Sequence, residues 1–131
     1  EITTRLVGSE MCIRDSYGLK EYGFHLLEVA APNHYLSLIK NADYVLSASF
    51  HGTAFSIKSE KQFYVVRGKH NGKVNMDDRM SSLLALCGLD SRQLIEDETW
   101  DDSAIDYRPV NEQLGREIER SKTYLRNALG E

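Results

Sequence analysis

The chain has 131 residues, of which 41% are hydrophobic and 27% are charged, and its net charge is −4. This length and composition predict one globular domain with a single core. The negative charge argues against a general binder of nucleic acid or anionic membranes. No apolar run is long enough to span a bilayer. The two cysteines, Cys12 and Cys87, make neither a disulfide framework nor a metal-ligand set, so we expect a cytoplasmic setting and no metal.

The first residues form a segment that differs from the remainder. Residues 1–16 hold neither a helical nor a strand period. Residues 6–16, LVGSEMCIRDS, closely resemble the peptide produced when sequencing-adapter DNA is translated at the broken end of an assembled gene. We therefore interpret residues 1–16 as non-native or disordered. Residues 17–131 are then expected to form the domain, as the C-terminal piece of a longer protein.

Strand and helix patterns alternate through the first half of that domain. In chain order they predict a strand at 24–29, a helix at 32–42, a strand at 44–46, a helix whose first turns include 53–57, and a strand at 62–67. Such alternation is typical of a Rossmann-like α/β fold with parallel strands and right-handed crossovers.

The second half begins with a long polar loop at 68–78. This loop and the strand before it carry Arg67, Lys69, His70 and Lys73, which is consistent either with an anion site or with a solvated surface. A helix is predicted at 79–87, where Cys87 is expected to be a core thiol. An acidic surface loop at 96–106 follows, and a long C-terminal helix at 110–129 closes the chain.

The strand at 44–46 and the helix after it meet at a polar corner, SFHGT at 49–53. Ligands of α/β folds bind beyond the carboxyl ends of the strands, and a helix N-terminus there attracts anions. His51 stands at this corner with a side chain that can carry a proton near neutral pH. A histidine in such a turn can equally be a capping residue, and the residues alone favour neither interpretation.

Three stretches of the chain together resemble the C-terminal domain of the polysaccharide pyruvyl transferase family. They are PNHYLSLIKNAD at 32–43, SFHGTAFSI at 49–57, and RMSSLLALCGL at 79–89 followed by Arg92. The resemblance runs from about residue 24 to the end, and the corner at 49–53 is its most specific part. It implies one Rossmann-like half of a two-domain GT-B-type fold, with the other half in an N-terminal domain missing from this chain.

The family chemistry implied is transfer of a pyruvyl group from phosphoenolpyruvate to a sugar of a cell-surface polysaccharide, which forms a pyruvate ketal. The acceptor would be a glycan or a lipid-linked sugar, and no cofactor would be needed. His51 would be the general acid that protonates the donor's methylene carbon. The donor would be held by Ser49, Gly52, Thr53, Lys73 and Arg79. In some family members a basic residue occupies the position of Ser49, so here the charge must come from elsewhere.

Two other interpretations remain open. One is a GT-B glycosyltransferase domain that binds a nucleotide sugar at the same corner, although no carboxylate stands clearly where it would hold a ribose. The other is a truncated, non-catalytic fragment, because half of a cleft cannot surround a transition state.

Overall fold

The computed structural model describes residues 31–67, 69–70, 73–74, 78–95 and 101–130. The predictions made for residues 1–30, including the strand at 24–29, lie outside the described residues, as does the part of the acidic loop at 96–100.

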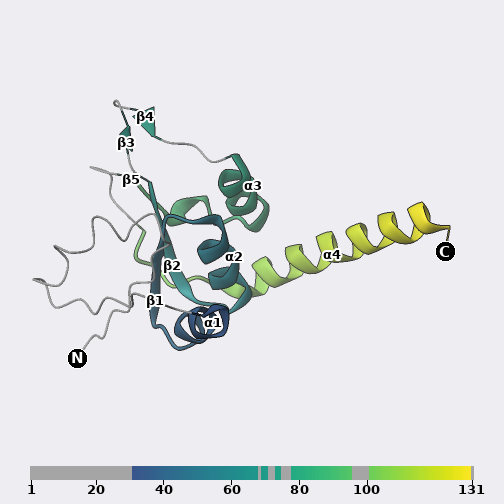
Figure 1. The fold of residues 1–131 in the computed structure, drawn as a ribbon. Coiled ribbons are helices and arrows are strands. Elements are labelled where there is room, and N and C mark those ends of the chain that lie inside the picture. The colour runs from purple at the N-terminus through teal and green to yellow at the C-terminus, as the bar shows by residue number, and fades with distance from the viewer. Residues whose placement is uncertain (1–30, 68, 71–72, 75–77, 96–100, 131) are drawn as a thin grey trace, which may run out of the picture.

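The centre of the fold is a parallel sheet of three strands in the order β1-β2-β5 (Figure 1). The strands are β1 (Tyr44–Ser47), β2 (Gln62–Arg67) and β5 (Gln93–Ile95). In the register, Ser47 lies opposite Val65, and Arg67 lies opposite Ile95. The predicted α/β class with parallel strands is confirmed for this sheet, and the two predicted strands at 44–46 and 62–67 are present.

Three helices lie on one side of the sheet: α1 (Pro32–Lys40), α2 (Phe50–Lys58) and α3 (Asp78–Cys87) (Figure 1). Proline at the start of α1 fits the fixed backbone angle of a first helical position. Gly88 follows α3 with a φ of 66°, a left-handed conformation that glycine adopts without strain. The predicted helices at 32–42 and 79–87 are therefore confirmed with small shifts at their ends.

Helix α2 starts earlier than the 53–57 pattern suggested. Its N-cap is Ser49, which has an extended backbone and whose Oγ accepts a hydrogen bond of 3.0 Å from the amide of Gly52. Both Ser49 and Thr53 are residue types that cap helices, and the structure uses the first. As a result, His51 and Gly52 lie in the first helical turn and not in a loop before it.

The predicted loop at 68–78 contains a short antiparallel pair, β3 (Lys69–His70) and β4 (Lys73–Val74). The expectation of an unstructured connection was therefore incomplete. The two residues between these strands in the sequence are Asn-Gly, the strongest signal for a two-residue hairpin connection. Figure 1 shows the pair beyond the end of β2, before the chain enters α3.

The last helix, α4 (Tyr107–Leu129), begins three residues before the predicted start. Asp106 caps it by accepting a hydrogen bond of 3.1 Å from the amide of Arg108. Its first turns pack beside α3, and the remainder extends away from the domain (Figure 1). Val110 is 2% exposed but Leu129 is 73% exposed, so the apolar residues of this helix belong to the core only near its beginning.

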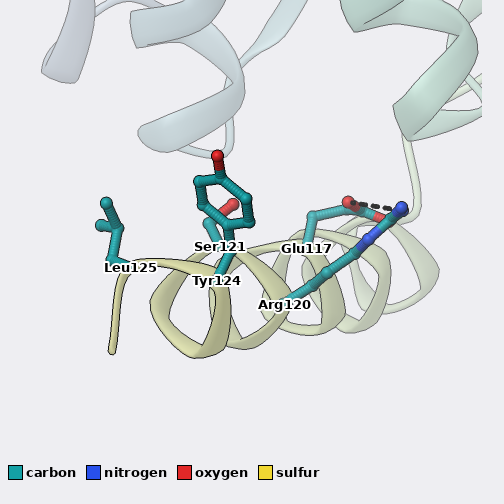
Figure 2. A pocket seen from close by; sticks show the side chains of 5 residues that line it. All are labelled: Glu117, Arg120, Ser121, Tyr124 and Leu125. Carbon is teal, nitrogen blue, oxygen red and sulfur yellow. Dashed lines mark ion pairs between the residues drawn. The ribbon is translucent and has the colours of Figure 1, made fainter. Parts of the chain in front are cut away.

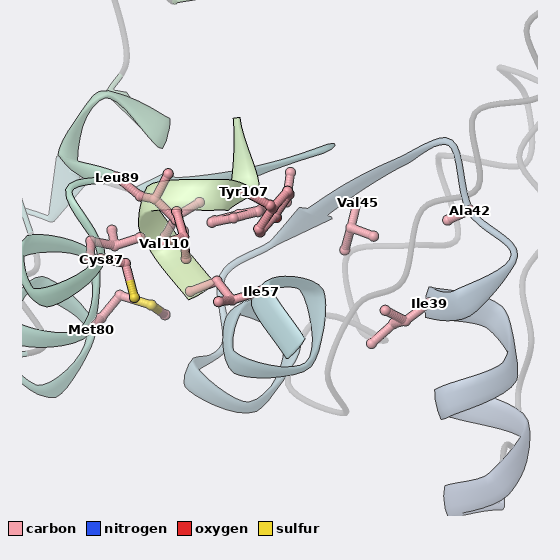
Figure 3. Close-up of a cluster of buried hydrophobic side chains, with 12 residues drawn as sticks. Ile39, Ala42, Val45, Ile57, Met80, Cys87, Leu89, Tyr107 and Val110 are labelled. Carbon is pink, nitrogen blue, oxygen red and sulfur yellow. The ribbon is translucent and has the colours of Figure 1, made fainter. Parts of the chain in front are cut away.

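The core lies between the helices and the sheet (Figure 3). Each helix and each of the strands β1 and β2 contributes to it, with Ile39, Val45, Ile57, Phe63, Val65, Met80, Leu84, Cys87, Tyr107 and Val110 among the buried side chains. Cys87 is a free thiol in this cluster, as predicted, and burial raises its pKa. On the opposite face of β2, Arg92 covers Tyr64, with its guanidinium carbon 5.6 Å from the ring centroid.

Candidate anion-binding site at the start of helix α2

The corner between β1 and α2 lies at the carboxyl edge of the parallel sheet. β1 ends at Ser47, and α2 begins three residues later at Phe50. Side chains at this edge of an α/β sheet face the region where such folds bind ligands. The predicted site residues of the 49–53 motif are thus brought to the expected edge by the backbone.

Two serine hydroxyls accept hydrogen bonds from backbone amides at the start of α2. The amide of Ser49 donates to Ser47 Oγ at 3.1 Å, and the amide of Gly52 donates to Ser49 Oγ at 3.0 Å. The first intrahelical bond runs from the amide of Thr53 to the carbonyl of Ser49, at 3.1 Å. A helix start leaves four amides without intrahelical partners, and the two serine hydroxyls accept hydrogen bonds from two of these amides.

The two remaining amides belong to Phe50 and His51. Within the described residues, neither amide has a hydrogen-bond acceptor. Both point along the positive end of the helix dipole, where an anion is stabilised. The start of α2 therefore offers two adjacent N–H donors to a carboxylate or a phosphate.

His51 is the second residue of α2 and its side chain is exposed. Its ring meets the ring of Phe50 edge to face, with 5.9 Å between centroids and 84° between planes. The imidazole thus packs against Phe50 on one side and is exposed to solvent. It is carried by one of the two residues whose amides have no acceptor within the described residues.

Arg79 comes to this corner from the first turn of α3. Its guanidinium carbon lies 5.7 Å from the centroid of the Phe50 ring. Phe50 thus contacts both Arg79 and His51, and places a permanent positive charge near the start of α2. Of the predicted basic donor ligands, Arg79 is the one that the described side chains bring to the motif.

The structure gives a reason for glycine at position 52 that the sequence did not reveal. A Cβ on this residue would lie 2.2 Å from Ser47 Oγ and 2.9 Å from the hydroxyl of Tyr35. The family resemblance had placed Gly52 among the residues that hold the donor. The structure shows that the space beside its Cα is filled by Ser47 and Tyr35.

Thr53 is fully buried, and both its hydroxyl and its backbone amide make hydrogen bonds within the start of the helix. Its Oγ1 donates to the carbonyl of Ser49 at 3.1 Å, the same oxygen that accepts from its amide. Since both donors are directed at Ser49, Thr53 supports the start of α2 rather than presenting a hydroxyl to solvent.

The remaining basic residues near the sheet edge are placed differently. Lys73 lies in β4, after the end of β2, but its side chain is outside the described residues. Arg67 is 7% exposed and is directed inward, with Nε donating to Gln93 Oε1 at 3.3 Å and Nη2 donating to Ser81 Oγ at 3.4 Å. Arg67 therefore joins β2 to β5 and α3.

Sequence reasoning missed three residues of this corner: Tyr35, Ser47 and Phe50. Ser47 stands two residues before the N-cap, a spacing that would have suggested a local hydrogen bond. Phe50 is adjacent to His51 in the motif itself. Tyr35 lies in α1, and only the tertiary fold brings its hydroxyl to Gly52.

A hollow elsewhere on the surface does not coincide with this chemistry. It has a volume of about 470 Å³ and lies on the outer half of α4, lined by Glu117, Arg120, Ser121, Tyr124 and Leu125 (Figure 2). All of its lining comes from one helix, and Glu117 and Arg120 are already paired at 3.8 Å. We therefore locate the candidate site by the donors at the start of α2 and not by this hollow.

In the part of the chain that the structure describes, no three His, Cys, Asp or Glu side chains converge where they could hold a metal ion. No helix among the described residues combines the length and the apolar character needed to cross a membrane.

Comparison with known families gave one match, to the model named polysaccharide pyruvyl transferase, over residues 4–70. The chain belongs to the polysaccharide pyruvyl transferase family. The matched region contains the whole β1–α2 corner and ends at the last residue of β3. Neither the curated proteins nor the solved structures contained a match.

The pyruvyl transferase match also bears on the extent of the resemblance. It begins at residue 4, so it includes most of the segment that we had set apart as non-native, and the nature of residues 1–16 stays a prediction. It does not reach Arg79 or α4, whose likeness to the family rests on the sequence patterns alone.

Proposed function

We propose that the protein transfers a pyruvyl group from phosphoenolpyruvate to a sugar of a cell-surface polysaccharide and forms a pyruvate ketal. Membership of the family indicates a transferase with a sugar acceptor. The observation that carries the finer proposal is the arrangement at the start of α2, where an exposed histidine stands beside two amides that have no acceptor among the described residues, with an arginine nearby.

The donor in this proposal is a small and highly charged anion. The amides of Phe50 and His51 would bind one of its anionic groups, and the guanidinium of Arg79 would bind the other. Ser49 would add a hydroxyl at the N-cap. Lys73 is a further candidate ligand from β4, whereas Gly52 and Thr53 would contribute by supporting the helix start.

The proposed reaction begins with proton transfer from His51 to the methylene carbon of the donor. The carbon that bears the phosphate then has oxocarbenium character and is attacked by one sugar hydroxyl, which loses its proton. The carbon–oxygen bond to phosphate breaks, and inorganic phosphate leaves. A second hydroxyl of the same sugar adds to that carbon and loses its proton, which completes the ketal. One hydroxyl proton is thereby balanced by the new methyl group and the other by the released phosphate.

The finer architecture is part of the same proposal. We infer from the family resemblance that this domain is one half of a GT-B-type arrangement, with a second Rossmann-like domain facing the start of α2. This second domain would exclude water from the cleft and hold the acceptor, either a glycan or a lipid-linked sugar.

The test is an assay of phosphate release from phosphoenolpyruvate in the presence of sugar acceptors, with NMR detection of the ketal methyl group. The assay is run on this chain and on the chain supplemented with the proposed second domain. Phosphate and ketal formed in equal amounts would support the proposal. Transfer from a nucleotide sugar, with phosphoenolpyruvate inert in both preparations, would overturn it.

A further inference from the structure

Helix α3 begins with a cation at the end where the helix dipole disfavours one. Arg79 is the second residue of α3, and its side chain is exposed. The amino-terminal end of a helix carries partial positive charge, which favours an acidic residue such as Asp78 and repels a guanidinium. An arginine at this position is therefore better explained by its contacts outside α3 than by the stability of the helix itself.

Outside α3, Arg79 contacts the ring of Phe50. The guanidinium carbon lies 5.7 Å from the ring centroid, within the range at which the face of an aromatic ring attracts a cation. Phe50 is half-buried and packs against the hydrophobic core. Because this packing limits the movement of the ring, the ring gives the long and exposed side chain of Arg79 a preferred position.

The residue that carries this ring also carries one of the backbone donors of the candidate site. The amide of Phe50 has no hydrogen-bond acceptor within the described residues. The distance between this amide and the ring is set by covalent geometry and by the rotamer of one side chain. The position of the Arg79 guanidinium relative to the amide therefore depends on Phe50.

A fixed distance between two anion-binding groups suits a ligand that has two charged groups. Phosphoenolpyruvate carries a phosphate and a carboxylate on the same carbon atom. Such a ligand gains the second contact fully only when the guanidinium is already held at the matching distance from the amides. An anion with one charged group does not bridge the two positions, so its affinity does not depend on that distance.

We propose that Phe50 is a specificity-determining residue of this site, although its side chain has no polar atom. Its ring holds the guanidinium of Arg79 at a set distance from the amides of Phe50 and His51. The site thereby selects small anions with two charged groups over anions with one. The inference rests on the proposed function, because it assumes that phosphoenolpyruvate binds to these amides and to Arg79.

The experiment is a titration of the isotopically labelled chain with phosphoenolpyruvate and, separately, with inorganic phosphate. The NMR shifts of the amides at positions 50 and 51 report binding, and the wild type should bind phosphoenolpyruvate more tightly than phosphate. Phe50→Leu keeps an apolar side chain and the backbone amide but removes the aromatic face. It should raise the Kd for phosphoenolpyruvate by about two- to fivefold, which corresponds to the usual strength of an exposed cation–π contact, and leave the Kd for phosphate unchanged.

Fluorinated phenylalanines at position 50 separate the electrostatic attraction of the ring from its shape, and they test the proposal even if Phe50→Leu fails to fold. Each fluorine draws electron density from the ring face and so weakens its attraction for a cation. The Kd for phosphoenolpyruvate should therefore rise with the number of fluorines, and this dependence should disappear in Arg79→Ala. The matched control is the same series at Phe55, whose ring contacts Tyr35, where the Kd should stay at the wild-type value.

A Kd for phosphoenolpyruvate that does not change with fluorination at Phe50 would overturn this inference and leave the proposed function intact. A fluorine dependence that persists in Arg79→Ala, or equal losses for the two anions in Phe50→Leu, would have the same consequence. If the wild type binds phosphoenolpyruvate no more tightly than phosphate, the inference fails while phosphoenolpyruvate stays the proposed donor. Wild-type amides that do not respond to phosphoenolpyruvate would overturn both proposals.

Discussion

The guanidinium carbon of Arg79 lies 5.7 Å from the centroid of the Phe50 ring, and this contact joins the first turn of α3 to the first residue of α2. His51 meets the same ring edge to face, with 5.9 Å between centroids. Phe50 therefore contacts both a permanent positive charge and an imidazole, which come from different helices. The residue that touches both is an aromatic that has no acid–base chemistry of its own.

Arg79→Ala is expected to raise the KM for phosphoenolpyruvate by about tenfold or more, because a charge-assisted hydrogen bond to the donor would be lost. Arg79→Lys should recover only part of this affinity, since lysine keeps the charge but not the planar group over Phe50. Steady-state kinetics at varied donor concentration measure the effect. Arg116→Ala, on the exposed face of α4, is the matched control. A donor KM that stays at the wild-type value in Arg79→Ala would remove Arg79 from the site.

His51→Gln is expected to lower kcat by about 100- to 10,000-fold, the usual contribution of a general acid. The donor KM should change little, because the backbone amide at this position is retained. Rapid-quench or steady-state measurements of phosphate release report both constants. The matched control is His34→Gln, an exposed histidine of α1. Full activity in His51→Gln would show that another group supplies the proton.

Gly52→Ala is expected to destabilise the domain by about 1–3 kcal/mol, because the new methyl group would meet Ser47 Oγ at 2.2 Å. Chemical denaturation measures the free energy of unfolding. Gly115→Ala is the matched control, since a Cβ there meets nothing within 4 Å and alanine favours a helix by about 0.5–1 kcal/mol.

Ser47→Gly combined with Gly52→Ala should recover part of the loss, because it removes the nearest atoms but leaves the Tyr35 hydroxyl at 2.9 Å. Equal stability changes in Gly52→Ala and Gly115→Ala would contradict the close packing described for this corner.

Asp106→Ala is expected to lower the Tm at neutral pH and to have little effect in acid. The pKa of Asp106 is held below its usual value, chiefly by the side chain of Arg108 and then by its backbone amide. A carboxyl whose pKa is lower in the folded state stabilises the protein above its unfolded pKa, and this contribution is lost as the pH falls through the folded value. Thermal unfolding between about pH 7 and about pH 2 follows the difference.

Asp106→Asn is the comparison for this effect, because asparagine caps a helix without titrating. Its Tm should stay close to the wild-type value at neutral pH. A difference between wild type and Asp106→Ala that persists unchanged in acid would show that the charge of Asp106 does not act through this cap.

The elements that the sequence predicted well are those with local signals. The strands at 44–46 and 62–67 are short apolar runs, and the helices after Pro32 and before Gly88 have residues at their ends that fit only those positions. The sequence left the start of α2 open because Ser49 and Thr53 both suit a cap, and the structure uses Ser49.

The sequence predicted where the candidate site lies, at the corner between a strand and a helix, but not which side chains contact one another there. The position of His51 beyond a strand followed from the alternation of strands and helices. The contact between Arg79 and Phe50 did not, because it requires α3 to pack beside α2. Arg67 was grouped with the loop charges, yet its partners Gln93 and Ser81 come from later elements and draw it inward.

Because burial changes along α4, the two ends of this helix are expected to differ in the free energy needed to open their hydrogen bonds. Around Val110 the backbone amides are shielded by the core, so their exchange with solvent deuterium requires the domain to open. Near Leu125 and Leu129, which are 57% and 73% exposed, the described part of the chain opposes unwinding with intrahelical contacts alone. Exchange would therefore accelerate turn by turn toward Gly130, although the sequence carries the same apolar spacing from end to end.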